Sequence, residues 1–588
     1  MNTVKPTRSE ANRIALVFWL AAFFALCLGE LSLIQHYYPV NDEMVMLTTS
    51  AAPFHPDPVD WIRTGFSRYF MAYPGWYTPF SSYLRPVWNA AYYVNSLLFG
   101  AHWGYYLLSN YFLHALMAAL VVWIGLLELS LTRTKALLAG LVILVCPAFI
   151  PKAFFYPCFA SDILTSVWVI AGFIALRARR YVWCWFALLL AVFTKEPALA
   201  VPVAVACYIL LTPGLGRFRY RSRLAAVMLI PTALWVVVRM LVFGPVAHAY
   251  AVGSLTGITG TLKTVAKGLL HWPTGVVLRG SRLTLAAGAG FNAVFWLVAA
   301  VCLWRYLASR KSVTGLRADL AAWNDVLQLG LFAGATGVLL VFLSAPPRFG
   351  ACFYPWFVLL IFYCWQWWPF QPFPLAGALC LVCITTGGIW QKRNVFTADK
   401  ARMERRSEMS RKFVDVVAGS GADVIFVVDD IVGGFDNMDA VRKFSGTRAR
   451  LIKLDDLNCI NEESAVLLDD DAANCTPTPS IRMSREGDHR FTITSTLNQG
   501  CMNHDFDAAF LDLVFSGSPD SKVRRVEKPY TLKYSPGALQ RAVLRHETLD
   551  TTPLDPVPMT VEVEGPLANA QVLVPDLCHR SFRTVSLR

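Results

Sequence analysis

The sequence predicts a polytopic α-helical membrane protein with about eleven spans, followed by a β-rich α+β domain outside the membrane. Of its 588 residues, 55% are hydrophobic and 16% are charged, which is more apolar surface than a soluble protein of this size carries. Apolar runs long enough to cross ~30 Å of hydrocarbon recur from residue 14 to residue 390. Beyond them the chain is polar, with short strand-like runs. The expected domains are therefore a transmembrane domain, 1–390, and a soluble domain, 391–588.

The apolar runs give candidate spans whose ends are defined to within a few residues. The first run, Ile14 to Ile34, is too long for the core of a signal peptide, and no small-residue cleavage site follows it, so we expect a retained anchor. The runs on either side of Lys195 are short, and they form either two spans or one kinked or re-entrant pair. The expected spans are 14–34, 104–127, 134–150, 160–176, 181–194, 197–211, 223–243, 291–308, 326–344, 350–367 and 373–390.

The basic residues predict the orientation of these spans. The formal net charge is +13, and Lys and Arg gather before the first span and after the second, fourth, sixth and eighth spans. If the span count holds, all of these segments lie on one side of the membrane, which by the positive-inside rule is the cytoplasmic side. We therefore expect an inner-membrane protein with a cytoplasmic N-terminus and an extracytoplasmic C-terminal domain. Contact with anionic lipid accounts for the charge, and no nucleic-acid partner is expected.

The segment 391–588 is predicted to open with a helix near 398–418 and to continue with strands. Its strand-like runs are 423–432, 490–497, 559–565 and 570–577. The segment holds four cysteines, an even number in an oxidising compartment, which predicts two disulfides. Sequence proximity favours Cys459–Cys475 together with Cys501–Cys578, but four cysteines allow three pairings.

Ionisable residues at the outward ends of the spans form the candidate site. Charged groups in such places are costly, so each is a functional candidate. These residues are Asp42 and Glu43 after the first span, Arg85, Asp162, the adjacent Lys195 and Glu196, and Arg348. A carboxylate opposite several cations beside a membrane suits one chemistry, in which a base deprotonates an acceptor hydroxyl while cations neutralise the phosphate that leaves a lipid carrier.

Four of these residues also have a plainer interpretation. Asp42 is otherwise a solvated loop carboxylate or a helix cap, and Asp162 is otherwise an N-cap of the fourth span. Arg85 is otherwise an anchor to lipid head groups. Lys195 is otherwise the partner of Glu196 in an internal ion pair.

The outward loop 244–290 contains a basic stripe. Lys263, Lys267 and His271 are spaced i, i+4 and i+8, which places them on one face of a helix. The stripe is expected either to bind the phosphate or pyrophosphate of a lipid carrier or to lie on anionic head groups.

The order of these residues resembles the GT-C superfamily of membrane glycosyltransferases. The acidic pair after the first span and the motif RPVWN…LLFG…NYFLHAL at 85–116 are similar to the O-mannosyltransferase-like branch. A second outward acid, a Lys-Glu before a short span and an Arg before a late span follow in order. The stretch VIFVVDDIVGGFDNMDAV at 424–441 resembles the opening of the soluble domain behind many bacterial members. The resemblance covers most of 1–390.

This resemblance implies an enzyme that takes a sugar from a polyprenyl-phosphate donor and transfers it on the extracytoplasmic face of the bilayer. The acceptor would be a cell-envelope glycan or another extracytoplasmic acceptor such as a protein. Asp42 would be the general base, with Glu43 beside it and Asp162 as the second acid. The cations would bind the donor phosphate. The sequence has no cluster with metal-ligand spacing, so no cofactor is expected to be required and a divalent metal is not indicated.

Three other functions remain open at this point. A glycan polymerase or ligase would use chains linked to polyprenyl pyrophosphate, but such enzymes usually carry a large loop between late spans and lack a soluble C-terminal domain. A transporter or flippase would show paired half-repeats and broken helices near the bilayer midplane, whereas the charges here cluster at one face. A structural scaffold would tolerate loss of the acids.

Overall fold

The structure is a computed structural model, and it describes residues 6–40, 42–54, 56–59, 85–145, 157, 160–243, 324–336, 352–366, 397–428, 438–454, 481–485, 490–495, 510–514, 530–533, 541–546, 557–562, 569–576 and 581–586. The chain folds into two compact units. Unit 1 comprises Met1–Ile34, Tyr83–Asn95 and Tyr105–Lys400, and unit 2 comprises Gln35–Ser82, Ser96–Gly104 and Ala401–Arg588. The segments Gln35–Ser82 and Ser96–Gly104 come from the loop between the first two predicted spans. They group with the C-terminal segment in unit 2. The predicted boundary between residues 390 and 391 stays a prediction.

Unit 1 is helical. The helices that begin in it are α1 (Arg8–Gly29), α2 (Leu31–His36), α5 (Pro86–Phe99), α6 (Tyr106–Leu127), α7 (Arg133–Leu144), α9 (Ala160–Arg177), α10 (Tyr181–Thr194), α11 (Val201–Leu211), α12 (Phe218–Phe243) and α16 (Tyr354–Gln366). Residues 324–336 are also helical. The 3₁₀ turns η1 (Trp103–Tyr105), η3 (Glu196–Ala200) and η4 (Pro213–Leu215) connect neighbouring helices.

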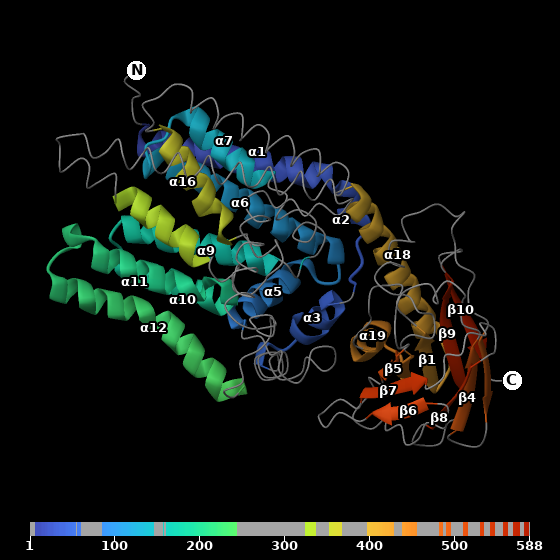
Figure 1. The fold of residues 1–588 in the computed structure, drawn as a ribbon. Coiled ribbons are helices and arrows are strands. Elements are labelled where there is room, and N and C mark those ends of the chain that lie inside the picture. The colour runs from blue at the N-terminus through green and yellow to red at the C-terminus, as the bar shows by residue number, and fades with distance from the viewer. Residues whose placement is uncertain are drawn as a thin grey trace, which may run out of the picture. The chain divides into compact units, whose positions relative to one another are not determined.

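The helices of unit 1 pack with sequence neighbours side by side. α6 lies against α1, α7 and α9, and α10 lies against α9 and α12, as Figure 1 shows. Three aromatic rings join α9, the helical residues 324–336 and α16: Phe173, Phe332 and Trp356 have ring centroids 4.8 to 5.3 Å apart. These contacts fix α9, whose first turn carries Asp162.

The described residues contain four helices that are long and apolar enough to cross a membrane: Arg8–Gly29, Trp103–Leu127, Ala160–Arg177 and Phe218–Leu241. Shorter apolar helices cover Tyr181–Thr194, Glu196–Leu211 and Tyr354–Tyr363. The predicted spans 291–308 and 373–390 lie outside the described residues, and 134–150, 326–344 and 350–367 lie only partly within them. The protein is therefore mostly helical and has the helices of a membrane protein. The count of eleven spans and their orientation stay predictions.

The first span ends earlier than its hydropathy predicts. α1 is capped by Thr7, stops at Gly29, and is followed by the separate helix α2. The carboxylate of Glu30 is buried at the break and bonds to Lys400 Nζ at 3.2 Å, while the same ammonium donates to the carbonyl of Gly29 at 3.4 Å. The helix therefore breaks inside the apolar run, at a buried acid whose partner lies far along the chain.

The described strands of unit 2 form three small sheets. In the first, β1 (Val424–Val428) pairs in parallel with β2 (Arg450–Leu454) and with β9 (Ala570–Asp576), and β10 (Ser581–Ser586) pairs antiparallel with β9. The second has the antiparallel order β3 (Ile481–Arg485), β4 (Arg490–Ser495), β8 (Val557–Glu562). The third has the antiparallel order β5 (Phe510–Val514), β7 (Arg541–His546), β6 (Tyr530–Lys533). Strands β1, β4, β8 and β9 fall on the four predicted runs.

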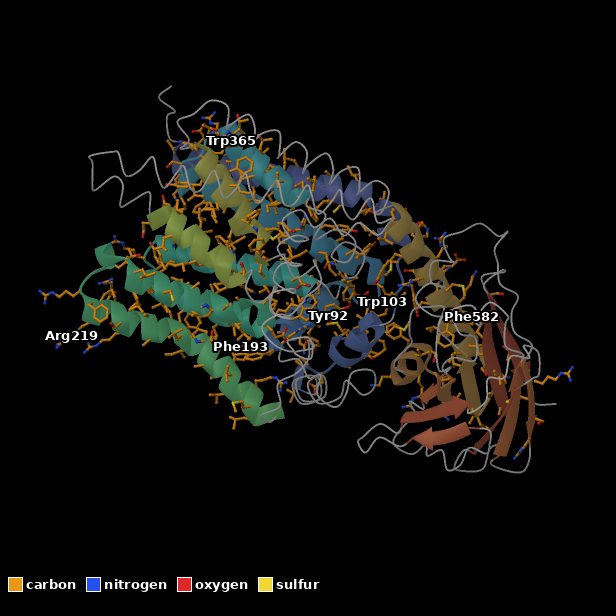
Figure 2. The ribbon with its side chains drawn as sticks, viewed as in Figure 1. Tyr92, Trp103, Phe193, Arg219, Trp365 and Phe582 are labelled. Atoms are coloured by element: carbon orange, nitrogen blue, oxygen red, sulfur yellow. The ribbon has the colours of Figure 1, made fainter. Side chains whose placement is uncertain are left out.

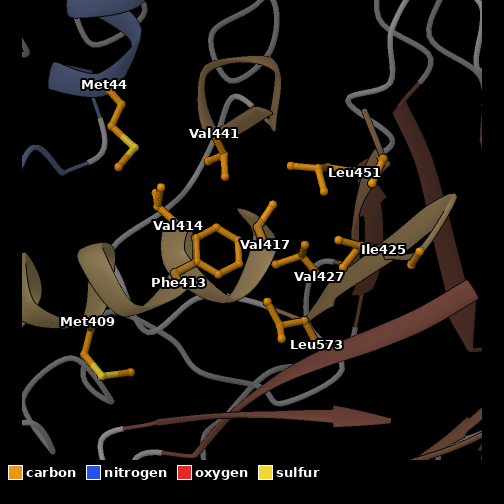
Figure 3. Packing of buried hydrophobic residues seen from close by; sticks show 12 residues of the cluster. Met44, Met409, Phe413, Val414, Val417, Ile425, Val427, Val441, Leu451 and Leu573 are labelled. Carbon is orange, nitrogen blue, oxygen red and sulfur yellow. The ribbon is translucent and has the colours of Figure 1, made fainter. Parts of the chain in front are cut away.

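Helices cover the first sheet of unit 2. α18 (Thr397–Gly419) leads into β1, and α19 (Met438–Ser445) provides the crossover that parallel neighbours such as β1 and β2 require. Figure 3 shows the core between these helices and the sheet, where Phe413 and Val417 of α18 meet Val441 of α19 and Leu573 of β9. On β10, Phe582, labelled in Figure 2, has its ring centroid 5.2 Å from that of Phe413.

The cysteine prediction falls outside the described residues. All four cysteines of the C-terminal segment lie there, so their pairing stays a prediction. The four cysteines whose side chains the structure describes, Cys27, Cys184, Cys207 and Cys352, are free thiols.

Candidate functional site

A buried ion pair joins the first turn of α9 to the junction between α10 and η3. Lys195 Nζ lies 2.6 Å from Asp162 Oδ1, and the two side chains are 3% and 5% exposed. Lys195 stands at the break because it is the C-cap of α10 and the N-cap of η3, with extended backbone angles. Oδ2 of Asp162 has no hydrogen-bond partner among the described residues. Buried charges of this kind are expensive unless they are paired, which the ammonium provides for one carboxylate oxygen.

A second ion pair lies beside the first. The guanidinium of Arg85 contacts Glu196 through Nη2 at 2.8 Å from Oε2 and through Nε at 3.2 Å from each carboxylate oxygen. Arg85 stands directly before α5, 111 positions away from its partner. Because Lys195 and Glu196 are consecutive, with Cα atoms ~3.8 Å apart, the two pairs are neighbours. Each pairs a cation with a carboxylate, so the four groups together carry no net charge.

Asn89 adds a polar side chain to this region that the sequence analysis did not select. It lies one turn after Arg85, with its N–H donating to the Arg85 carbonyl at 3.1 Å. Its side chain is 1% exposed, and neither amide atom has a partner among the described residues. The signal was present in the sequence, because Asn89 is the last residue of the quoted RPVWN motif.

The chain after Arg348 also reaches the first turn of α9. Arg348 itself lies outside the described residues, but Cys352 follows it by four positions. The Cys352 thiol is buried, accepts a hydrogen bond from Ser166 Oγ at 3.6 Å and lies 3.9 Å from the carbonyl oxygen of Asp162. The predicted segments around residues 85, 162 and 195 thus meet in unit 1. The described part of the segment that follows Arg348 begins at Cys352, which contacts the same turn of α9.

The predicted acidic pair belongs to unit 2, where it opens a helix rather than lying in a loop. α3 spans Asp42–Ser50. Glu43 is 1% exposed and its carboxylate accepts a hydrogen bond from the Tyr37 hydroxyl. Its N–H donates to the Val40 carbonyl at 3.1 Å. Glu43 is thus held inside the protein, and its expected place as a neighbour of the base stays a prediction. The prediction that Asp42 is the base stays a prediction.

Tyr38, in the segment just before α3, is also perturbed by its surroundings. Burial and the charge of Asp415 raise the pKa of this phenol to about 12, although Arg411 acts in the opposite direction. The hydroxyl therefore stays protonated at neutral pH, and no additional negative charge arises next to the acidic helix.

The remaining predicted residues are not placed. Lys263, Lys267 and His271 lie outside the described residues, as does Arg348. In the part of the chain that is described, no group of three or more His, Cys, Asp or Glu residues could hold a metal ion.

A second ion-pair cluster lies at the other end of α9. Arg177 Nε is 3.0 Å from Glu128 Oε2, and its Nη1 bonds to Asp325 and to Gln328. Arg177 is one of the basic residues that follow the fourth predicted span, 160–176. Here its two acidic partners come from segments 49 and 148 positions away, so local sequence could not reveal them.

Comparison with protein-family models and with curated protein sequences gives no match for this chain. The arrangement must therefore be interpreted from its own chemistry. Two cations that already bond to carboxylates attract an anionic ligand more weakly than free cations would, because the carboxylates offset their charge. Asp162, with one oxygen bonded to lysine and the other without a partner among the described residues, keeps a lone-pair direction for a further donor.

Proposed function

We propose that the protein is a membrane glycosyltransferase of the GT-C type. It moves a sugar from a polyprenyl-phosphate carrier to an extracytoplasmic acceptor such as a cell-envelope glycan. One observation carries the proposal: Arg85, Asp162, Lys195 and Glu196, selected from sequence as members of one constellation, form two neighbouring ion pairs. The two pairs bring together ionisable residues from three separate segments at the ends of apolar helices, and ionisable groups in such places are functional candidates.

The roles follow from the chemistry of the transfer. A carboxylate removes the proton of the acceptor hydroxyl, and cations stabilise the phosphate that leaves. Asp42 is the first candidate for the base and Asp162 the second. Arg85 and Lys195, with Arg348 and the stripe at 263–271, are the candidates for the phosphate ligands. The N-terminus is cytoplasmic and unit 2 extracytoplasmic in this proposal, as the basic loops predict.

A second candidate function is transport. It is favoured by the burial of the Asp162–Lys195 pair among apolar helices, because ionisable residues inside a membrane also mark ion and proton pathways. A glycan polymerase or ligase that uses polyprenyl-pyrophosphate-linked chains is the alternative within the enzymes. A polymerase or ligase, like the proposed enzyme, moves sugar to a new acceptor and differs in its donor. A transporter would carry its cargo across the membrane without moving a sugar to a new acceptor.

The experiment supplies membranes containing the protein with radiolabelled polyprenyl-phosphate sugars and measures label in a lipid-free acceptor. Asp42→Asn keeps the shape of the side chain but cannot take up the proton, so turnover should fall on the order of 10²–10⁴-fold. Asp57→Asn, an exposed acid in the same outward segment, is the matched control and should transfer at the wild-type rate. If Asp42→Asn is fully active and Asp162→Asn is not, the base is Asp162. Label that crosses the membrane but stays on its carrier would support transport instead.

A further inference from the structure

The acid-bearing helix α3 is part of the core of unit 2. Met44 on α3 is 1% exposed and belongs to one cluster with Phe413 and Val417 of α18 and Val441 of α19. In Figure 3 the Met44 side chain extends from α3 toward this cluster. A helix of nine residues is not stable by itself in water, so α3 depends on this packing.

Two buried serines fasten α18 to the chain directly before α3. Ser407 Oγ donates to the Tyr38 carbonyl at 3.1 Å, and Ser410 Oγ donates to the Pro39 carbonyl at 2.7 Å. Both serines are at most 1% exposed. They are three positions apart and so share one face of α18. Their small side chains let the helix approach the neighbouring backbone closely.

The hydrogen bonds leave this segment little freedom. The next carbonyl, that of Val40, accepts the N–H of Glu43 at 3.1 Å. Three successive carbonyls, at 38, 39 and 40, are therefore each bonded, two to α18 and one to the first turn of α3. The direction in which the chain enters α3, and with it the placement of Asp42 and Glu43, is set by α18.

α19 adds a second attachment through aromatic contacts. The ring of Phe444 lies 6.2 Å from that of Tyr38 and 5.0 Å from that of Phe54, centroid to centroid. These two residues precede and follow α3. Residues from 401 onward thus contact the chain on both sides of the acidic helix as well as its buried face.

We propose that Ser407 and Ser410 are positioning residues for the acidic helix α3. The C-terminal segment would then take part in sugar transfer by holding the acidic residues in place. The catalytic half of this inference rests on the proposed function. The positional half, that α3 is held by these two hydroxyls, stands without it. The experiment measures the halves separately.

The test uses the full-length protein in nanodiscs, with Ser407→Ala, Ser410→Ala and the double variant. Hydrogen exchange followed by mass spectrometry reports on residues 43–50, and transfer kinetics report kcat and the donor KM. The matched control is Ser420→Ala, because Ser420 donates to Gln571 of β9 at 2.9 Å in the same unit and does not bond to residues 38–40.

We expect exchange at 43–50 to rise in the serine variants while exchange in β1 stays at the wild-type rate. The double variant should lose on the order of 10- to 10²-fold in kcat at an unchanged donor KM, since a small misplacement of a reacting group has effects of this size. The Ser420→Ala protein should match the wild type at 43–50.

Three results would overturn the inference. Unchanged exchange at 43–50 in the double variant would show that the hydroxyls do not hold α3. Equal increases at 43–50 and in β1 would show that they support the whole unit and not α3 in particular. Increased local exchange with an unchanged kcat would remove the catalytic half. If the wild-type protein shows no transfer activity, the proposed function is refuted instead. The exchange measurements would still test whether the two serine hydroxyls hold α3.

Discussion

Removing one member of the Asp162–Lys195 pair should cost much more stability than removing both. At 2.6 Å and an effective dielectric constant of ~20, the attraction between the two charges is about 6 kcal/mol. Bringing two charges out of water costs several kcal/mol per ion, so the pair as a whole contributes little net free energy. A single replacement removes the attraction and leaves the desolvation cost of the remaining ion. Lys195→Met and Asp162→Asn should therefore differ sharply from their combination.

The assay is unfolding of the detergent-solubilised protein, followed for the wild type, both single variants and the double variant. Lys195→Met should destabilise by about 3–5 kcal/mol, because the Asp162 carboxylate is left buried without its cation. The Asp162→Asn/Lys195→Met protein should recover most of that loss. The coupling energy of the cycle measures the pair directly.

A matched control is available on the surface of unit 2. Lys412 and Glu408 form an i, i+4 pair at 2.8 Å whose side chains are 39% and 40% exposed. Lys412→Met makes the same substitution where water screens the charges, so it should change stability by less than ~1 kcal/mol. The reasoning fails if Lys195→Met unfolds like Lys412→Met, or if the two single effects at 162 and 195 simply add. Wild-type transfer by the stability-rescued double variant would show that the pair is structural only.

Three further predictions concern packing, topology and disulfides. A Cβ added at Gly140 of α7 would meet Val122, Phe18 Cζ at 3.0 Å and the Ala118 carbonyl oxygen at 3.2 Å, so Gly140→Ala should lower the unfolding midpoint. Gly334→Ala should not, because no atom of the described residues lies within 4 Å of the added Cβ. Alkaline-phosphatase fusions near residue 400 should be active in a bacterial host and those near residue 220 inactive; the reverse pattern would overturn the proposed orientation. The four cysteines of the C-terminal segment should resist alkylation without reductant, and mass spectrometry finding four free thiols would contradict that prediction.

Hydropathy predicted the helices better than it predicted where they end. The apolar runs at 104–127, 160–176 and 181–194 lie within a few residues of the helical segments found there. The run 14–34 was read as one span, yet the helix breaks at Glu30, where the carboxylate bonds to a lysine 370 positions away. A sequence window of about 20 residues measures apolarity and carries no information on such a partner.

The candidate residues could be selected from the sequence, but their pairing could not. The sequence left open an ion pair between the adjacent Lys195 and Glu196 as the alternative to phosphate binding. In the structure each bonds instead to a residue from another segment, because consecutive side chains on an extended residue and a following turn point in different directions. Asp42 was expected in a loop, since a short polar stretch after a span gives no helical period. Its helix forms through packing in unit 2, and packing partners distant in sequence leave no local signal.

The two ion pairs place a condition on any phosphate-binding role for their cations. Lys195 bonds to Asp162 in the structure, so a donor phosphate competes with that carboxylate for the positive charge of the ammonium. If Asp162 is the base, the competition ends during the reaction: once the carboxyl has taken up the acceptor proton, it is neutral and the ammonium can neutralise the leaving phosphate. Asp162→Asn imitates the protonated carboxyl. It should abolish transfer, on the order of 10²–10⁴-fold, while binding the polyprenyl-phosphate donor at least as tightly as the wild type. Titration of the variant with a donor analogue in nanodiscs would measure this, with Lys195→Met as the comparison that should bind more weakly. Weaker binding by Asp162→Asn would refute the exchange of partners and leave Lys195 as a structural counter-ion.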